Sequence, residues 1–143
     1  MRGLTVSEEN KRDMFEISAH AHFSAAHRLI GYAGACARVH GHNWDVEVFL
    51  RGAALDELGI LCDFRDVKAA LHDALEELDH AELNDLPAFA ARNPTSEALA
   101  LHLFGTLSRR LNTARCRVQR VTVSETPGTA ASYWADDDAA PQR

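Results

Sequence analysis

Two histidines, His40 and His42, stand two residues apart in the stretch CARVHGHNW. Residues two apart in an extended strand project from the same face, so the two imidazoles can converge on one ion. Zinc held by three protein ligands with a fourth position open is the usual catalytic arrangement for such groups. The third ligand must come from elsewhere, and three candidates lie in or just after the preceding predicted strand: His20, His22 and His27. Spacing does not choose among them, and without a third ligand the pair would only form a polar strand face.

Cys36 lies four residues before His40, in a loop of small residues that also contains Arg38. Positive charge near a thiol increases its thiolate fraction, which suits a nucleophile or a proton acceptor. A thiolate is also a zinc ligand, so a closed structural site with four ligands is the alternative. For Cys62 and Cys116 we expect the ordinary role of small buried side chains.

The pair Asp79 and His80 follows the last turn of a predicted helix. An aspartate can fix the tautomer of a histidine and increase its basicity, as carboxylates do beside catalytic imidazoles. Adjacent residues need not touch, however, and the alternative is a helix end whose charge suits the dipole.

Glu125 ends the predicted strand VTVSE and has the same parity as the apolar residues Val121 and Val123. A carboxylate on that face needs partners, and a ligand with two parallel N–H donors would satisfy it. The alternative is a glutamate that meets solvent at the end of the strand.

The composition narrows the class of protein. A chain of 143 residues that is 46% hydrophobic can bury the core of a single domain, and its net charge of −6 argues against nucleic acid or anionic membrane as a partner. No segment approaches the roughly 20 apolar residues that span a bilayer, and three widely spaced cysteines do not form a disulfide framework. We expect a cytoplasmic protein with one domain at 14–134 and flexible ends at 1–13 and 135–143.

Hydrophobic periodicity predicts the elements that carry these residues. Alternation predicts two strands in the N-terminal third, and a period of three to four residues predicts two helices, the first capped by Asp63 and ending near Leu78, the second capped by Thr95. Alternation then returns for two more strands, at 116–125 and 130–134. The order ββααββ predicts an α+β fold with a four-stranded antiparallel sheet and both helices on one face.

Six segments in the same order resemble the family of 6-pyruvoyltetrahydropterin and 6-carboxytetrahydropterin synthases, and together they span nearly all of residues 15–133. They are FSAAHRL (23–29), CARVHGHNW (36–44), GILCDFRDVK (59–68), LDHAELN (78–84), NPTSEALA (93–100) and VSETPGTAASY (123–133). The resemblance implies the tunnelling fold, in which ββααββ subunits form trimeric barrels that stack as hexamers with active sites between subunits.

The resemblance also implies a role for each candidate residue. It implies three zinc ligands, His27, His40 and His42, which settles the third ligand. It implies a catalytic group of Cys36, Asp79 and His80 that moves protons, and Glu125 as the anchor of the pterin ring. It gives no role to His20, His22 or Trp134.

The reaction follows from the subtype. Family members act on 7,8-dihydroneopterin triphosphate and form either a 6-pyruvoyl product or, with loss of acetaldehyde and triphosphate, a 6-carboxylate on the route to 7-deazaguanine compounds such as queuosine. Three residues separate Cys36 from His40, which resembles the 6-carboxy type, because the 6-pyruvoyl type has a longer insertion. We therefore expect a zinc-dependent 6-carboxytetrahydropterin synthase; the alternatives are a 6-pyruvoyl synthase and a zinc-containing pterin-binding protein without turnover.

Overall fold

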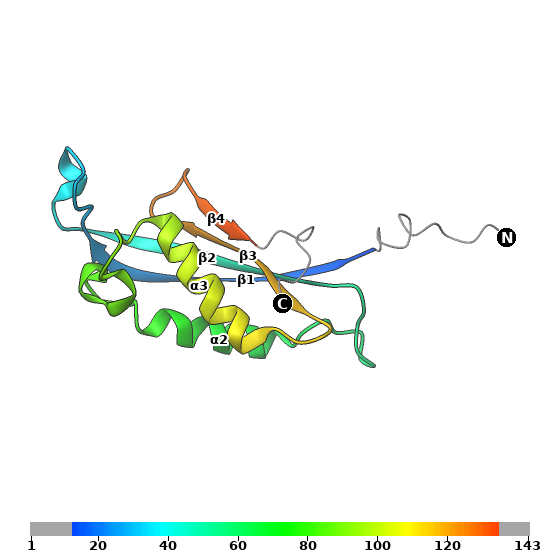
Figure 1. Ribbon diagram of the computed structural model, residues 1–143. Helices are drawn as coiled ribbons and strands as arrows, with labels where there is room; N and C mark the ends of the chain where they lie inside the picture. Colours follow the sequence, from blue (N-terminus) through cyan, green and yellow to red (C-terminus); the bar gives the residue numbers. More distant parts are fainter. Residues whose placement is uncertain (1–12, 135–143) are drawn as a thin grey trace.

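The computed structural model describes residues 13–134. The ends that were expected to be flexible therefore lie outside the described residues, apart from Asp13. Four strands form one antiparallel sheet in which neighbours in the chain are neighbours in space: β1 (Phe15–His27), β2 (His40–Gly52), β3 (Arg117–Ser124) and β4 (Ala131–Trp134). Two helices, α2 (Phe64–Glu76) and α3 (Ser96–Leu111), lie on one face of this sheet (Figure 1). The predicted order and layers are confirmed.

Three short 3₁₀ turns join these elements: Ala35–Ala37, Leu83–Asp85 and Pro87–Phe89. The first turn lies in the loop between β1 and β2, and the other two lie between α2 and α3. The predicted irregular loop around Cys36 is thus largely non-strand and contains one turn of helix.

The core lies between the sheet and the two helices because β2 alternates strictly. One set of its side chains is completely buried: Trp44, Val46, Val48 and Leu50. Asp45, between them, faces away from the helices and is exposed. Trp44 stacks on Phe23 of β1 with 5.9 Å between ring centroids, and its indole Nε1 donates to the Ala25 carbonyl at 3.1 Å. Trp44 therefore fixes β1 and β2 to each other on the core side of the sheet, close to the end of the hairpin that carries the histidines.

Both predicted helix starts are confirmed. The Asp63 side chain accepts from the Arg65 amide, and the Thr95 hydroxyl accepts from the Ala98 amide at 3.1 Å. The helix α2 ends at Glu76, two residues before the expected end at Leu78. In the described part of the chain, no helix has the length and hydrophobicity needed to cross a bilayer.

Gly52 closes β2 at a point where two backbone segments meet. A Cβ atom at this position would lie 2.2 Å from the Arg115 carbonyl oxygen and 2.6 Å from a methyl group of Leu61. Only glycine fits such a close approach. The loop before β3 therefore packs directly on the end of β2.

Candidate functional site

The β1–β2 register brings three histidines together at the open end of the hairpin. His27, the last residue of β1, pairs directly with His40, the first residue of β2, and His42 pairs with Ala25. Their ligand-capable nitrogens all lie within 4.8 Å of one another, and the three ring centroids are 4.6 to 5.2 Å apart. The expected three-histidine cluster is present, and strand pairing is what forms it.

Backbone carbonyls hold two of the rings in one orientation. His27 Nδ1 lies 2.8 Å from the Pro94 carbonyl oxygen, and His40 Nδ1 lies 2.7 Å from the Arg38 carbonyl oxygen. A carbonyl only accepts, so Nδ1 carries the proton in both rings and Nε2 keeps a free lone pair. This is the tautomer that a metal-binding histidine requires.

The Nε2 atoms have no protein donor or acceptor to satisfy them. Within the described residues, His27 Nε2 and His42 Nε2 are buried without a hydrogen-bond partner. Burial lowers the pKa of both imidazoles, which favours the neutral form that binds metal. Three converging rings, two of which carry buried nitrogens without a hydrogen-bond partner, fit a zinc ion.

Trp44 forms the floor of the cluster. Its indole ring makes edge contacts with the rings of His27 and His42, at centroid distances of 4.8 and 5.3 Å. The cluster therefore rests directly on the buried core, which restricts the ring orientations of both histidines.

Glu125, one residue beyond β3, reaches the cluster from the side. Its Oε2 lies 3.5 Å from His27 Nε2 and 3.7 Å from His42 Nε2. Glu125 and His42 also line a cavity of about 600 Å³, together with Asn43 and Asp45. The carboxylate is therefore directed at the histidines on one side and borders a cavity on the other.

Asp79 and His80 form a contacting pair at the edge of β1. Asp79 Oδ2 lies 3.0 Å from His80 Nδ1, and Asp79 Oδ1 accepts from the Ser24 amide at 2.9 Å. The hydrogen bond from Ser24, and next the contact with His80, lower the pKa of the Asp79 carboxyl group. His80 has a positive φ of 59°, and its amide donates to the Ser24 carbonyl at 2.6 Å. Both residues are therefore tied to the backbone of one strand residue.

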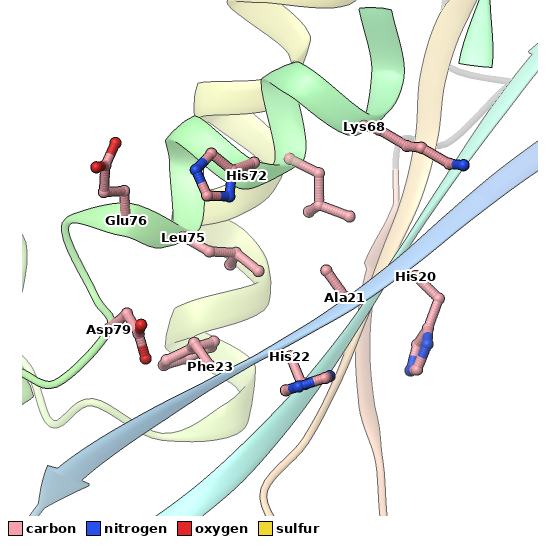
Figure 2. Close-up of a pocket in the computed structure, with 10 residues that line it drawn as sticks. His20, Ala21, His22, Phe23, Lys68, His72, Leu75, Glu76 and Asp79 are labelled. Atoms are coloured by element: carbon pink, nitrogen blue, oxygen red, sulfur yellow. The ribbon is translucent and has the colours of Figure 1, made fainter. Parts of the chain in front are cut away.

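Asp79 also borders a groove between β1 and α2. Figure 2 shows Asp79 near one end of this groove beside Phe23, and Lys68 farther along α2. The His80 side chain is 82% exposed. Its imidazole is thus oriented by Asp79 and open to a reacting group, as the carboxylate–imidazole prediction requires.

Cys36 stands apart from both groups. It lies in the 3₁₀ turn of the β1–β2 loop, where its carbonyl accepts from the Leu29 amide at 2.8 Å, and its side chain is half-buried. Among residues 13–134, it belongs to no cluster that could hold a metal, and no hydrogen bond joins it to Asp79 or His80. Within one chain, Cys36 is therefore not part of the three-histidine cluster.

Other predicted residues fall outside the site. His20 and His22 are exposed on the sheet face away from the helices, and His20 Nε2 lies 3.6 Å from an Asp45 carboxylate oxygen. Cys116 is buried, and burial raises the pKa of its thiol to about 11; Cys62 is half-buried. Neither histidine reaches the metal cluster, and both cysteines have the expected packing role.

Sequence reasoning missed the backbone contributors to the site and a separate group of residues on α2. Pro94 and Ser24 act through backbone groups, which have no signature in the side-chain pattern. A second exposed group on α2 could also hold a cation: His72, Asp73 and Glu76. Helical spacing could have indicated this group, but Asp73 is already paired with Arg110.

Known proteins share both the sequence and the fold. Residues 16–136 match the family described as 6-pyruvoyl tetrahydropterin synthase. The 6-carboxy-5,6,7,8-tetrahydropterin synthase of Bacillus subtilis is 34% identical over 126 residues, covering 83% of this chain and 84% of that protein. The enzyme of the same name from Synechocystis sp. is 35% identical over 118 residues, covering 79% and 88%.

A solved structure agrees with the fold. The 6-pyruvoyl tetrahydropterin synthase of Caenorhabditis elegans superposes with a TM-score of 0.77 at 27% identity, covering 87% of this chain and 98% of that one. The match extends over the whole sheet, both helices and the residues of the histidine cluster. The chain belongs to the 6-pyruvoyl tetrahydropterin synthase family.

Proposed function

We propose that this protein converts 7,8-dihydroneopterin triphosphate to 6-carboxy-5,6,7,8-tetrahydropterin with release of acetaldehyde and triphosphate. The observation that carries the proposal is the cluster of three converging imidazoles, two of them with buried Nε2 atoms that lack a hydrogen-bond partner, in a chain of this family. The names of the relatives from Bacillus subtilis and Synechocystis sp. support the 6-carboxy product. The short spacing between Cys36 and His40 supports the same product.

Zinc is the proposed cofactor, held by His27, His40 and His42. When bound there, it would act as a Lewis acid towards the hydroxyl groups of the substrate side chain. The protein contributes in two ways: burial lowers the pKa of His27 and His42, and the carbonyls of Pro94 and Arg38 orient the rings of His27 and His40.

Glu125 is the proposed anchor of the pterin ring. A carboxylate can accept two parallel hydrogen bonds from the amino and ring N–H groups on the guanidine-like edge of a pterin. The cavity beside Glu125 supports this role because it adjoins the metal cluster. A ring bound here would place its side chain towards the histidines.

Cys36, Asp79 and His80 are the proposed proton-transfer groups. Asp79 holds His80 Nδ1, so the exposed imidazole can accept and return a proton through its other nitrogen. The separation of Cys36 from this pair in one chain supports a site shared between subunits of a homo-oligomer, which we propose is a hexamer of two trimers. We also propose a cytoplasmic location, a single catalytic domain at 14–134, and a supply role for 7-deazaguanine or queuosine synthesis.

The discriminating experiment identifies the products. Purified protein with zinc is given 7,8-dihydroneopterin triphosphate, and we expect mass spectrometry to find the 6-carboxy pterin and acetaldehyde. A 6-pyruvoyl product without acetaldehyde would support the activity named for the Caenorhabditis elegans structure. Absence of any turnover would leave a pterin-binding protein.

A cysteine variant tests the proton-transfer role. We expect Cys36→Ala to keep zinc binding and to lose most turnover, whereas Cys62→Ala, at a distant thiol, keeps both. Loss of zinc from Cys36→Ala would mean that the thiol is a ligand and would contradict its assignment.

A further inference from the structure

The carboxylate of Glu125 lies where a further metal ligand would lie. Ligand atoms at 2.0 to 2.2 Å from a tetrahedral zinc ion are separated from one another by about 3.4 Å. Glu125 Oε2 is 3.5 Å from His27 Nε2 and 3.7 Å from His42 Nε2. These two distances match the edges of a coordination tetrahedron, and they are too long for hydrogen bonds.

The protonation state of the histidines makes this approach unfavourable unless a cation lies between the groups. His27 Nδ1 carries the proton that the Pro94 carbonyl accepts, so Nε2 presents a lone pair to the carboxylate oxygen. A metal ion bound to both groups satisfies Nε2 and Oε2 at once.

No competing cation in the described chain holds Glu125. Within residues 13–134, the carboxylate of Glu125 lies within ion-pair distance of His27 and His42. No arginine or lysine of this part of the chain lies within salt-bridge distance of it. The side chain is 38% exposed on its cavity side. The carboxylate can therefore turn from the histidines to a ligand in that cavity.

We propose that Glu125 is the fourth ligand of the metal in the substrate-free protein, and that the pterin ring displaces it. This inference rests on the proposed function for the identity of the metal and of the ligand. On binding, the metal–Oε2 bond breaks and its lone pair stays on the carboxylate, which then accepts the two N–H groups of the pterin edge. The vacated position becomes available to a substrate hydroxyl only after the ring is seated, so the metal site opens in response to its ligand.

The test is zinc affinity in the absence of substrate, measured by competition with a chromophoric chelator. We expect Glu125→Gln to bind zinc at least about 10-fold more weakly than the wild-type protein, since an amide is a poor replacement for a ligating carboxylate. Asp45→Asn is the matched control, because Asp45 lines the same cavity but pairs with His20 and not with the cluster. We expect this variant to stay within about 2-fold of wild type, which separates ligation from the loss of a nearby charge.

A pterin probe without hydroxyl groups tests the exchange. A 7,8-dihydropterin with a methyl group at position 6 presents the same N–H edge but has no side-chain hydroxyl group to bind the metal. We expect it to weaken zinc binding several-fold in the wild-type protein, because it takes the carboxylate away, and to have no such effect in Glu125→Gln.

Zinc affinity of Glu125→Gln within about 2-fold of wild type would overturn the inference. If that variant does not fold, a zinc-loaded crystal structure of the wild-type protein decides: Oε2 at about 2.0 to 2.2 Å from the metal supports ligation, and a distance above about 3 Å refutes it. The product assay is independent of both measurements. If the protein binds zinc through Glu125 but forms no 6-carboxy product, this inference is supported and the proposed reaction is contradicted.

Discussion

Replacing Trp44 with phenylalanine tests whether the histidine cluster depends on the core beneath it. Trp44 is completely buried, donates one hydrogen bond to the Ala25 carbonyl and contacts the rings of His27 and His42. Phenylalanine keeps an aromatic ring for the stack with Phe23 but has no N–H group and a smaller volume.

The expected cost has two parts. Leaving the buried Ala25 carbonyl without its donor costs about 1 to 3 kcal/mol. The smaller ring leaves a partial void, for which we take about 1 kcal/mol, a fraction of the 3 to 5 kcal/mol for deleting a whole buried ring. The free energy of unfolding of the metal-free protein should therefore fall by about 2 to 4 kcal/mol. Zinc affinity should fall by up to about 10-fold, because the two rings lose part of their support.

The assay is urea unfolding followed by circular dichroism, with chelator competition for zinc. Trp134→Phe is the matched control, because Trp134 is the chain's other tryptophan and is 55% exposed on β4. It should change stability by less than about 0.5 kcal/mol. If Trp44→Phe behaves like this control in both measurements, the cluster does not depend on its aromatic floor and the reasoning is refuted.

Three further predictions concern the ligands, the close backbone approach and the acid–base pair. His42→Ala should lose zinc while His22→Ala, on the opposite sheet face, keeps it; full metal occupancy in His42→Ala, measured by elemental analysis, would contradict the three-histidine assignment. Gly52→Ala should destabilise the fold by at least about 2 kcal/mol in urea because of its overlap with a backbone carbonyl, whereas Gly59→Ala, with a positive φ of 80° but open space, should cost only about 1 kcal/mol. Equal costs would mean that the overlap relaxes. The lowered pKa of Asp79 favours its ionised form in the folded state, so its stabilising effect is present above the ordinary value of 3.8 and is lost as the pH falls through the folded value. Urea unfolding from pH 7 to pH 3 should therefore show wild type losing its advantage over Asp79→Asn at the acidic end, and an advantage that persists there would count against this linkage.

Strand periodicity predicted part of the metal centre and left the rest open. The two-residue spacing of His40 and His42 predicted a shared face because alternation is a local property of a strand. The choice of His27 over His20 and His22 depends on the pairing of β1 with β2, which is a long-range property. Parity distinguishes these residues only after the buried face of β1 is known, so local spacing could not make the choice and the family resemblance did.

The acid–base pair shows a different limit of sequence reasoning. The sequence indicated Asp79 and His80 as a possible pair, but side chains of adjacent residues usually diverge. They meet here because His80 adopts a left-handed backbone conformation and because the amide and carbonyl of Ser24 hold both residues against β1. Backbone groups are the same at every position, so nothing in the side-chain pattern marks Ser24 or Pro94 for these contacts.

Because His27 pairs directly with His40, the positions of the histidines do not depend on the length of the loop that carries Cys36. The proposed metal ligands lie on the two strands at the open end of a hairpin, and the loop 28–39 that carries Cys36 begins and ends beside His27 and His40. Residues can be added to or removed from the part of this loop that precedes Arg38 without changing the strand register, so that the Arg38 carbonyl keeps its contact with His40. The position of the Cys36 thiol relative to the histidine cluster can then change while the cluster stays the same. If Cys36 has the proposed proton-transfer role, lengthening the loop in this chain would change the position of the thiol while the arrangement of the three histidines stays constant.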